Sequence, residues 1–270
     1  MKVTSYLNLN FQDDVPFPER VEMAAEAGVD GIEFYGWDLG IDGVASVDDS
    51  FYGPQFDPDA IVDSIEDHGL ELVYMSGDRP PLTDPERSED ALESIERSLT
   101  LADEYNCRFV NVKAGPTQTG LSREVQRQSV VNVLRQAIPA VESAEASLLL
   151  EPLNAIDAPE QLIHTAEEGY ALLDAVDSPD VQLLLDFYHE QLGRGNIINN
   201  IRANAGSYVS HVHVADVPTR AQPGTGELHW DAIVETLSET AYDGYLGGEF
   251  IPMGDPISAL ETLVSIGDRY

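Results

Sequence analysis

Basic residues are scarce in this chain. It has 14 lysines and arginines against 49 aspartates and glutamates, a formal net charge of −35. Only two of the basic residues are lysines, Lys2 and Lys113. Binding to a nucleic-acid backbone depends on basic patches that release counterions, so the charge argues against a nucleic-acid partner. The acids are spread along the chain, and such a surface repels itself unless concentrated salt screens it. The composition therefore indicates a salt-adapted, halophilic cytoplasm.

The chain also lacks the features of disulfide-linked, exported and membrane-spanning proteins. Its single cysteine, Cys107, permits no intrachain disulfide, and we expect a packed thiol because no histidine is evidently paired with it. No apolar run reaches the roughly 18 residues that a membrane span requires. The first residues lack the basic and then apolar pattern of a signal peptide. We therefore expect a cytoplasmic protein with no membrane partner.

Short apolar runs alternate with amphipathic segments along the chain, and no linker divides it. The runs predicted as strands are 3–9, 31–35, 71–76, 108–113, 147–152, 181–187, 209–215 and 245–250. The segments predicted as helices are 18–27, 58–68, 88–106, 122–145, 160–176 and 229–240. Eight strands leave about 34 residues for each unit, which predicts a single α/β domain over 1–270, a (β/α)8 TIM barrel. The alternative, a doubly wound open sheet, usually carries a glycine-rich phosphate loop, and NLNFQDD is not one.

Four of the predicted strands have polar side chains at or near their ends. The run LLLE ends in Glu151, LLLD ends in Asp186, LGGE ends in Glu249, and HVHVAD contains His213. Function in a TIM barrel sits at the carboxyl ends of the strands, and a carboxylate after three leucines is costly to bury unless it is paired or metal-bound. Three carboxylates and one imidazole suit Mn²⁺, Mg²⁺ or Co²⁺ better than a structural zinc ion. These four residues are the predicted ligands of a divalent metal.

Two histidines share one face of the run His-Val-His-Val, because side chains alternate along a strand. We expect His213 to bind the metal. His211 lies two residues deeper on the same face and is expected to support His213. A purely structural pair and direct ligation by His211 are the alternatives.

Several motifs resemble the hydroxypyruvate isomerase family, which belongs to the xylose isomerase-like sugar isomerases and epimerases. They are EPLN at 151–154, DFYHEQ at 186–191, HVHVADVPTRAQPGTGELHW at 211–230 and GYLGGEFIP at 244–252. PFPER at 16–20 and GIEFYGWD at 31–38 are similar to early strands of that family, so the resemblance covers essentially the whole chain. It implies that the four predicted ligands hold a divalent metal. The chain departs from the family in two places. The position of His213 is often Gln in the isomerases and His in ketose epimerases, and Ala221 and Gln222 replace a His and an acid after Arg220.

Four further residues are predicted to bind substrate. His189 matches a substrate-contacting histidine of the epimerases, with a capping or surface role as the alternative. Arg220 would face an anionic or hydroxylated substrate, with a surface ion pair as the alternative. Asp157 would hold a substrate hydroxyl or cap its loop. Lys113 ends a predicted strand in a chain almost without lysine, which indicates a retained role, with simple exposure as the alternative. Two residues of the second strand region are expected to line the mouth of the pocket, Glu33 and Trp37.

Together these features predict a metal-dependent isomerase of the aldose–ketose type, an intramolecular oxidoreductase. Its substrate would be a small α-hydroxycarbonyl compound, with conversion of hydroxypyruvate to 2-hydroxy-3-oxopropanoate as the leading reaction. Glu151 and Glu249 would be the acid–base pair for proton transfer through an enediolate that the metal stabilises. His213 favours a ketose 3-epimerase or inosose isomerase as the alternative. An endonuclease-IV-like nuclease would need more histidines and a basic face; a sugar-binding barrel and a homo-oligomer remain open.

Overall fold

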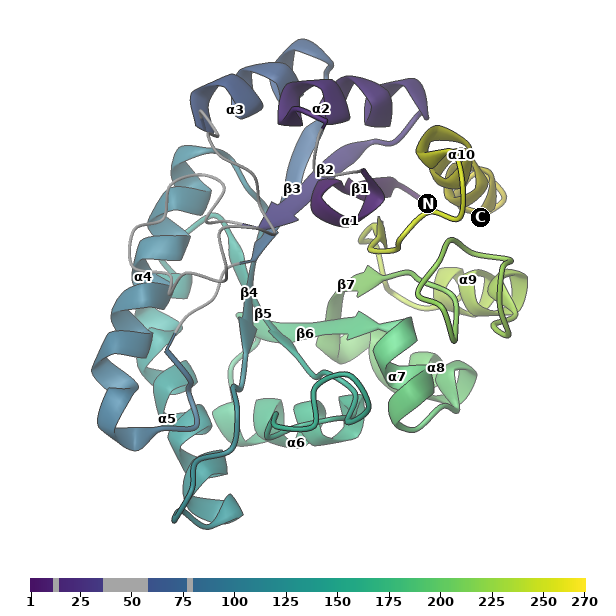
Figure 1. Ribbon diagram of the computed structural model, residues 1–270. Helices are drawn as coiled ribbons and strands as arrows, with labels where there is room; N and C mark the ends of the chain where they lie inside the picture. The colour runs from purple at the N-terminus through teal and green to yellow at the C-terminus, as the bar shows by residue number, and fades with distance from the viewer. Residues whose placement is uncertain (12–14, 36–57, 77–79) are drawn as a thin grey trace.

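The chain folds into a closed barrel of eight parallel strands in the order β1 to β8, ringed by helices (Figure 1). The computed structural model describes residues 1–11, 15–35, 58–76 and 80–270. The strands are β1 Val3–Tyr6, β2 Gly31–Tyr35, β3 Glu71–Ser76, β4 Phe109–Lys113, β5 Ser147–Glu151, β6 Val181–Asp186, β7 Val209–His213 and β8 Leu246–Gly248. The predicted TIM barrel is confirmed, and the sequence located all eight strands.

The helices agree less closely with the sequence-based expectation. They are α1 Leu7–Asn10, α2 Phe17–Glu26, α3 Pro58–Asp67, α4 Ser88–Glu104, α5 Arg123–Val141, α6 Ala166–Val176, α7 Phe187–Gly193, α8 Ile197–Tyr208, α9 Trp230–Ser238 and α10 Pro256–Gly267. The first strand was predicted to reach residue 9, but it ends at Tyr6, where α1 begins. The helix predicted over 160–176 begins only at Ala166, because the Thr165 hydroxyl caps it by accepting a hydrogen bond from the Glu168 amide. The helices α7, α8 and α10 were not predicted.

Two hydrophobic clusters stabilise the barrel. The larger one lies between the strands and the surrounding helices and includes outward-facing strand residues such as Val110 and Val112. A smaller one fills the inside of the barrel and contains aromatic and aliphatic side chains, Tyr6, Val73, Tyr74, Phe109, Leu149, Leu184 and Tyr245. Because the barrel interior is packed with side chains, polar chemistry is confined to the carboxyl end of the strands. Cys107 is buried, and burial raises the pKa of its thiol to about 12, as expected of a packed cysteine.

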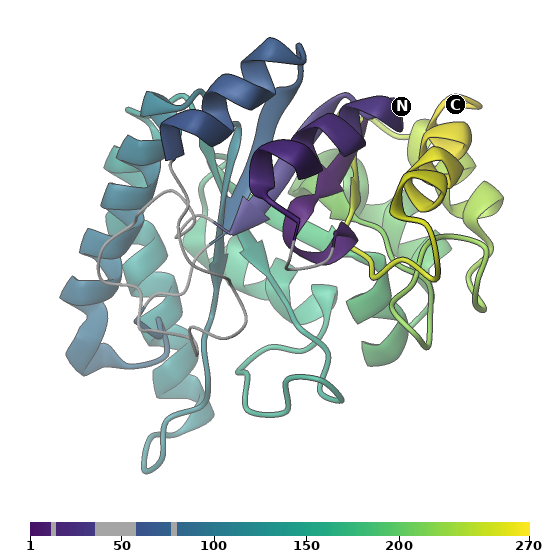
Figure 2. The same cartoon turned by 45° about the horizontal axis from the view of Figure 1, so that its top comes forward.

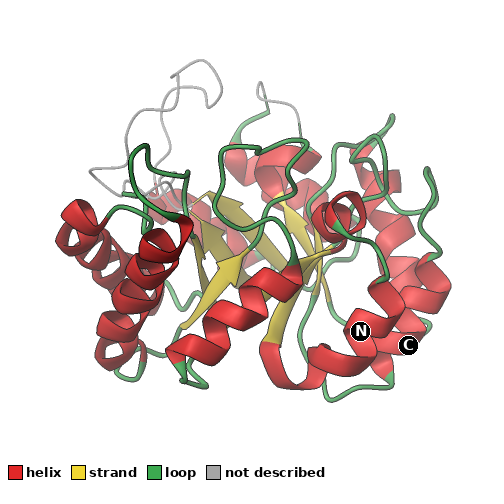
Figure 3. Cartoon of the chain, turned by 90° about the horizontal axis from the view of Figure 1, so that it is seen from below, coloured by secondary structure: helices red, strands yellow, loops and turns green. Residues whose placement is uncertain are grey.

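The two ends of the barrel differ. Long connections, such as the one between β5 and α6, project from the carboxyl ends of the strands (Figures 2 and 3). Both chain termini lie at the opposite end, where the Met1 amino group donates a hydrogen bond of 2.5 Å to the Gly267 carbonyl (Figure 3). None of the helices in the described segments has the length and apolarity needed to cross a membrane.

Candidate metal centre and active site

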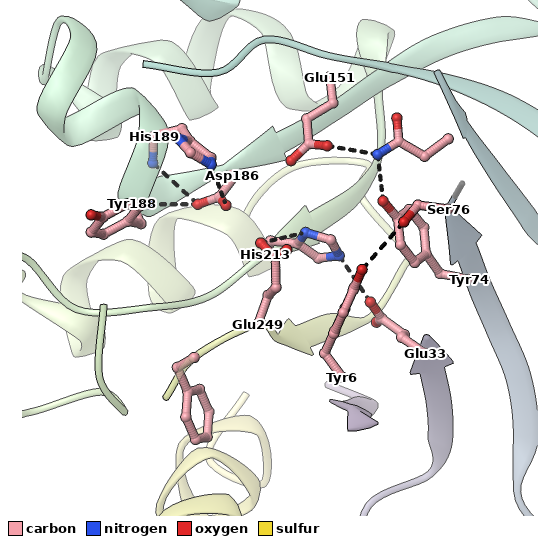
Figure 4. A network of polar contacts seen from close by, with 12 residues as sticks. Tyr6, Glu33, Tyr74, Ser76, Glu151, Asp186, Tyr188, His189, His213 and Glu249 are labelled. Carbon is pink, nitrogen blue, oxygen red and sulfur yellow. Dashed lines mark hydrogen bonds and ion pairs between the residues drawn. The ribbon is translucent and has the colours of Figure 1, made fainter. Parts of the chain in front are cut away.

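The four predicted metal ligands meet at the carboxyl end of the barrel. Glu151, Asp186 and His213 are the last residues of β5, β6 and β7, and Glu249 directly follows β8. The register places Asp186 opposite His213, and each of the four residues offers one atom within 4.8 Å of the others. Their side chains point toward a common centre in Figure 4. All four are buried, so this is a closely packed group of ionisable side chains.

Two buried atoms of this group make no hydrogen bond in the described part of the chain, Oδ2 of Asp186 and Nδ1 of His213. The other oxygen of Asp186, Oδ1, accepts hydrogen bonds from the Tyr188 and His189 amides at 2.7 and 3.2 Å, which caps α7 and fixes the carboxylate. The Nδ1 atom of His213 lies 3.2 Å from Oε2 of Glu249. A buried polar atom without a partner is costly. A divalent cation between these donors would satisfy both atoms, and three oxygens with one nitrogen fit such an ion.

The charges of the site also fit a cation. Burial and the negative charge of Glu249 raise the pKa of Asp186 to about 7. Burial alone would raise the pKa of Glu249 as well, but the Arg220 guanidinium and the His213 imidazole outweigh it and hold that pKa well below its usual range. Carboxylates this close repel each other when ionised, and a bound cation removes the repulsion.

A buried glutamate supports the two histidines from the far side of the barrel. The carboxylate of Glu33 contacts Nε2 of His211 at 2.9 Å and Nε2 of His213 at 2.8 Å, and its side chain is fully buried. Burial would raise the pKa of Glu33, but the two imidazoles lower it to about 2. The expectation that Glu33 lines the mouth of the pocket is wrong, because β2 points its side chain inward beneath the metal centre. His211 lies deeper than His213, as the alternation predicts, and Trp37 lies outside the described residues.

This contact would orient His213 toward a metal. Burial alone would lower the pKa of His213, but the carboxylates of Glu249 and Glu33 hold it well above its usual range. Because Glu33 holds the proton on Nε2, a bound metal would replace the proton on Nδ1, which faces Glu249. Space for the Glu33 carboxylate depends on Gly247, because a Cβ there would lie 2.7 Å from Oε1 of Glu33 and 2.8 Å from Nε2 of His211. The sequence does not reveal this role of Glu33, because the contacting residues are separated by 178 and 180 positions.

Replacement of Glu33 by Gln is expected to weaken metal binding by about 10- to 100-fold, the usual effect of losing a group that orients a metal-binding histidine. The Gln side chain keeps one oxygen that can accept a hydrogen bond from one of the two imidazoles. Its NH₂ group would face the imidazole of the other histidine, where Glu33 has an oxygen. Titration calorimetry with Mn²⁺ measures the change, and Glu71→Gln, on the neighbouring strand β3 and half exposed, is the control. Equal Mn²⁺ affinities of Glu33→Gln and the unaltered protein would contradict the orienting role.

Glu151 accepts a hydrogen bond that the sequence did not predict. The Asn111 amide donates a hydrogen bond of 2.6 Å to Oε2 of Glu151 and also contacts the Tyr74 hydroxyl. Asn111 lies on the inner face of β4, two residues before Lys113. Its inward position was readable from the alternation in RFVNVK, but its partner was not. The contact turns the Glu151 carboxylate toward the centre in Figure 4.

His189 presents an N–H group to the same centre. Its Nδ1 accepts a hydrogen bond from the Asn154 backbone amide at 3.3 Å and lies 2.6 Å from the Asn154 side-chain amide. The ring proton is therefore on Nε2, which lies 3.7 Å from Oδ2 of Asp186. Burial and the charge of Arg220 lower the pKa of His189 to about 4, so the ring is neutral at pH 7. A neutral donor at this position suits a substrate oxygen.

The other predicted substrate residues surround this group. Arg220 donates a hydrogen bond of 2.6 Å to Oε2 of Glu249, and its guanidinium lies 5.2 Å from the centre of the Tyr188 ring. Asp157 is exposed and accepts a hydrogen bond of 3.1 Å from the Asn154 amide. Lys113 pairs with Glu151 across the β4–β5 ladder, and its charge contributes to lowering the pKa of His189. The structure thus brings all eight predicted site residues to one end of the barrel, and their roles stay predictions.

Comparisons with known proteins agree on the family of this chain. Residues 21–263 match the family described as xylose isomerase-like TIM barrel. The chain belongs to this family. It is 26% identical over 261 residues to 2-oxo-tetronate isomerase of Pectobacterium atrosepticum, covering 94% of this chain and 93% of that protein. It is 26% identical over 241 residues to hydroxypyruvate isomerase of Escherichia coli, covering 87% and 88%.

Solved structures agree with the barrel. The crystal structure of AP endonuclease, family 2, from Brucella melitensis superimposes with a TM-score of 0.82 at 27% identity, covering 98% of this chain and 99% of that one. The predicted family is confirmed by these matches. Because the curated relatives are named isomerases, the predicted enzyme class, an isomerase, is confirmed as well.

Proposed function

We propose that this protein is a metal-dependent isomerase that interconverts a small α-hydroxy ketone and the corresponding aldehyde. The leading reaction is conversion of hydroxypyruvate to 2-hydroxy-3-oxopropanoate. The observation that carries the proposal is the convergence of Glu151 and Glu249, from β5 and β8, with Asp186 and His213 within 4.8 Å. The names of the two curated relatives support a small keto acid as substrate, and Arg220 supplies a cation for its carboxylate.

Each residue of the site has its own role in the proposed reaction. Glu151, Asp186, His213 and Glu249 would hold a divalent cation, which would supply positive charge to stabilise a developing enediolate. One glutamate removes the proton from the hydroxyl-bearing carbon, and the other delivers a proton to the former carbonyl carbon. The proton of the substrate hydroxyl passes to the former carbonyl oxygen, so the hydroxyl and the carbonyl exchange places. The neutral His189 donates a hydrogen bond from Nε2 to a substrate oxygen, and Arg220 orients the substrate carboxylate. Mn²⁺, Mg²⁺ and Co²⁺ are all compatible with this set of ligands.

A ketose 3-epimerase or inosose isomerase is the second candidate function. It is favoured by a histidine, His213, among the four candidate ligands and by the neutral donor His189 beside them. The two candidates use the same glutamates but differ in substrate length and in reaction. The isomerase moves the carbonyl to the neighbouring carbon, whereas the 3-epimerase inverts the configuration at C3. Proton NMR in D₂O with Mn²⁺ and a series of C3 to C6 keto-compounds tests both. Turnover of hydroxypyruvate supports the isomerase, turnover of hexuloses alone supports the epimerase, and no turnover of any compound contradicts both.

A nuclease function is not supported by the charges. DNA binding requires cations that replace the counterions of the phosphate backbone, and the net charge of −35 opposes this. The described ligand group contains one histidine and three carboxylates, a set that is poor in nitrogen for a zinc cluster. We infer a small-molecule substrate and no nucleic-acid partner.

The acidic surface supports the proposal that the protein works in concentrated salt. Surface arginines are paired with single acids, as in Arg97–Glu93, Arg123–Glu168 and Arg269–Asp231, and the excess of acids remains as the net charge of −35. Paired contacts of this kind contribute little, so repulsion between the remaining acids dominates at low ionic strength.

The melting temperature is expected to rise by more than about 5 °C between dilute buffer and 1 M KCl, where the screening length falls to about 3 Å. Differential scanning calorimetry measures the change. Sucrose at equal osmolality is the control, because it is excluded from the surface but screens no charge. A melting temperature that is independent of KCl would remove the halophilic assignment and leave the enzyme assignment untouched.

A further inference from the structure

The connection between β7 and α9, residues 214–229, is built around one buried carboxylate. Asp216 is fully buried and accepts hydrogen bonds from three backbone amides and from one indole. The donors are Val217 N at 2.9 Å, Gly224 N at 2.9 Å, Leu228 N at 3.1 Å and Trp230 Nε1 at 3.0 Å. These donors come from both ends of the connection. The carboxylate therefore holds its two ends and its middle together.

The same connection carries Arg220 in a fixed backbone conformation. Arg220 has a φ of 54°, in the left-handed region that a residue with a Cβ seldom adopts. The Asp216 amide donates a hydrogen bond of 2.7 Å to the Ala221 carbonyl, and the Ile251 amide donates one of 2.8 Å to the Arg220 carbonyl. Because the carbonyls of Arg220 and Ala221 are both held, the Arg220 side chain starts from one defined direction, toward Glu249 and Tyr188.

The backbone at Gly226 passes very close to the Asp216 carboxylate. A Cβ at Gly226 would lie 2.0 Å from the Val217 carbonyl oxygen and 2.6 Å from Oδ1 of Asp216. Only a glycine lets this part of the connection pass so near to the carboxylate. The packing is thus specific for Asp216 in its present position.

We propose that Asp216 is the positioning residue that holds Arg220 over the metal centre for the substrate carboxylate. Arginine has several rotatable bonds, and ordering it on binding would cost conformational entropy. A connection that is already ordered removes part of that cost before the substrate arrives. The inference rests on the proposed function, since it gives Arg220 an anionic substrate to bind. Within the described residues, Asp216 itself contacts neither the candidate metal ligands nor the guanidinium of Arg220.

Asp216→Asn tests the proposal, because the amide keeps the shape but turns an NH₂ group toward donors that need an acceptor. We expect the KM for hydroxypyruvate to rise at least about tenfold, as the loss of charge-assisted hydrogen bonds to one loop implies. The value of kcat should change less than about threefold, and the Mn²⁺ affinity should stay within about twofold, because the four ligands are untouched. A merely structural lesion would lower the active fraction and kcat without raising KM.

A double-mutant cycle ties the effect to Arg220. In an Arg220→Met background, where the cation is gone and an apolar stem remains, Asp216→Asn is expected to raise KM by less than about twofold. An additive, tenfold increase in that background would overturn the proposal. Glu227→Gln is the matched control, since it makes the same carboxylate-to-amide change on the exposed side of the same connection, and it should leave KM unchanged.

A second variant tests the proposal if Asp216→Asn does not fold, and hydrogen exchange tests it if the protein does not turn over hydroxypyruvate. Should Asp216→Asn not fold, Trp230→Phe replaces it, because it removes one of the four hydrogen bonds to Asp216 and keeps an aromatic side chain, and it should raise KM in the same direction. Should the unaltered protein not turn over hydroxypyruvate, the proposed function fails, but hydrogen exchange still tests the positioning. The amides of 214–229 should exchange at least about tenfold faster in Asp216→Asn while the strands remain protected. Unchanged exchange would overturn the role of Asp216.

Discussion

Replacement of Glu151 or Glu249 by Gln is expected to lower kcat by at least about 10²-fold, within the range of about 10² to 10⁴ that general acid–base assistance contributes. An amide keeps the shape and an oxygen donor but cannot accept the substrate proton. Mn²⁺ affinity should fall much less than kcat, because the other ligands remain. Steady-state kinetics with hydroxypyruvate and titration with Mn²⁺ separate the two effects.

Isotope transfer provides the second readout for the two glutamates. If they move the proton through an enediolate that exchanges with solvent, deuterium from D₂O should enter the product at the carbon that receives the proton. Glu190→Gln is a suitable control, since its carboxylate lies on α7 but contacts the Ala166 amide and the Asn200 side chain instead of the metal ligands. Complete retention of label from a C-deuterated substrate, together with active Gln variants, would show that the glutamates are not the acid–base pair.

Asp186→Ala is expected to abolish metal binding. The protein should hold close to one equivalent of divalent metal after mild loading, and the variant should hold almost none, as measured by elemental analysis. Asp186 also caps α7 through Oδ1, so the alanine variant loses two functions at once. Asp186→Asn separates them, because its amide oxygen still caps the helix while the charge that attracts the cation is gone. Asp63→Ala, on the exposed face of α3, is the surface control, and full metal content in Asp186→Ala would disprove the site.

The fold was predictable because each strand carries its own local signal. Runs such as LLLE and LLLD mark β5 and β6, and parallel register then brings their ends to the same rim without any further information. The candidate ligands Glu151, Asp186, His213 and Glu249 were located in this way. That residues 1–270 form one domain remains a prediction, and so do the catalytic roles.

What the sequence did not predict depends on contacts between distant residues. The partnership of Glu33 with His211 and His213 crosses the barrel, so no local pattern reports it. The hydrogen bond between Asn111 and Glu151 joins neighbouring strands, but its existence depends on side-chain direction as well as register.

The helices α8 and α10, which were not predicted, differ in their local signals. The sequence of α8, IINNIRANAGSY, contains three asparagines and a glycine, which are poor helix formers, so its helical tendency is weak without tertiary packing. The start of α10 did carry a signal, Asp255 before Pro256, where the aspartate caps the helix.

The candidate ligands all come from the second half of the barrel, β5 to β8, whereas Glu33 and Asn111 reach them from the first half. This division means that the candidate site is complete only when the barrel is closed. The ring joins β8 to β1 and β4 to β5, and these two seams bring Glu33 and Asn111 to the candidate ligands. A fragment that contained only β5 to β8 would carry all four candidate ligands but neither of the contacts that orient His213 and Glu151.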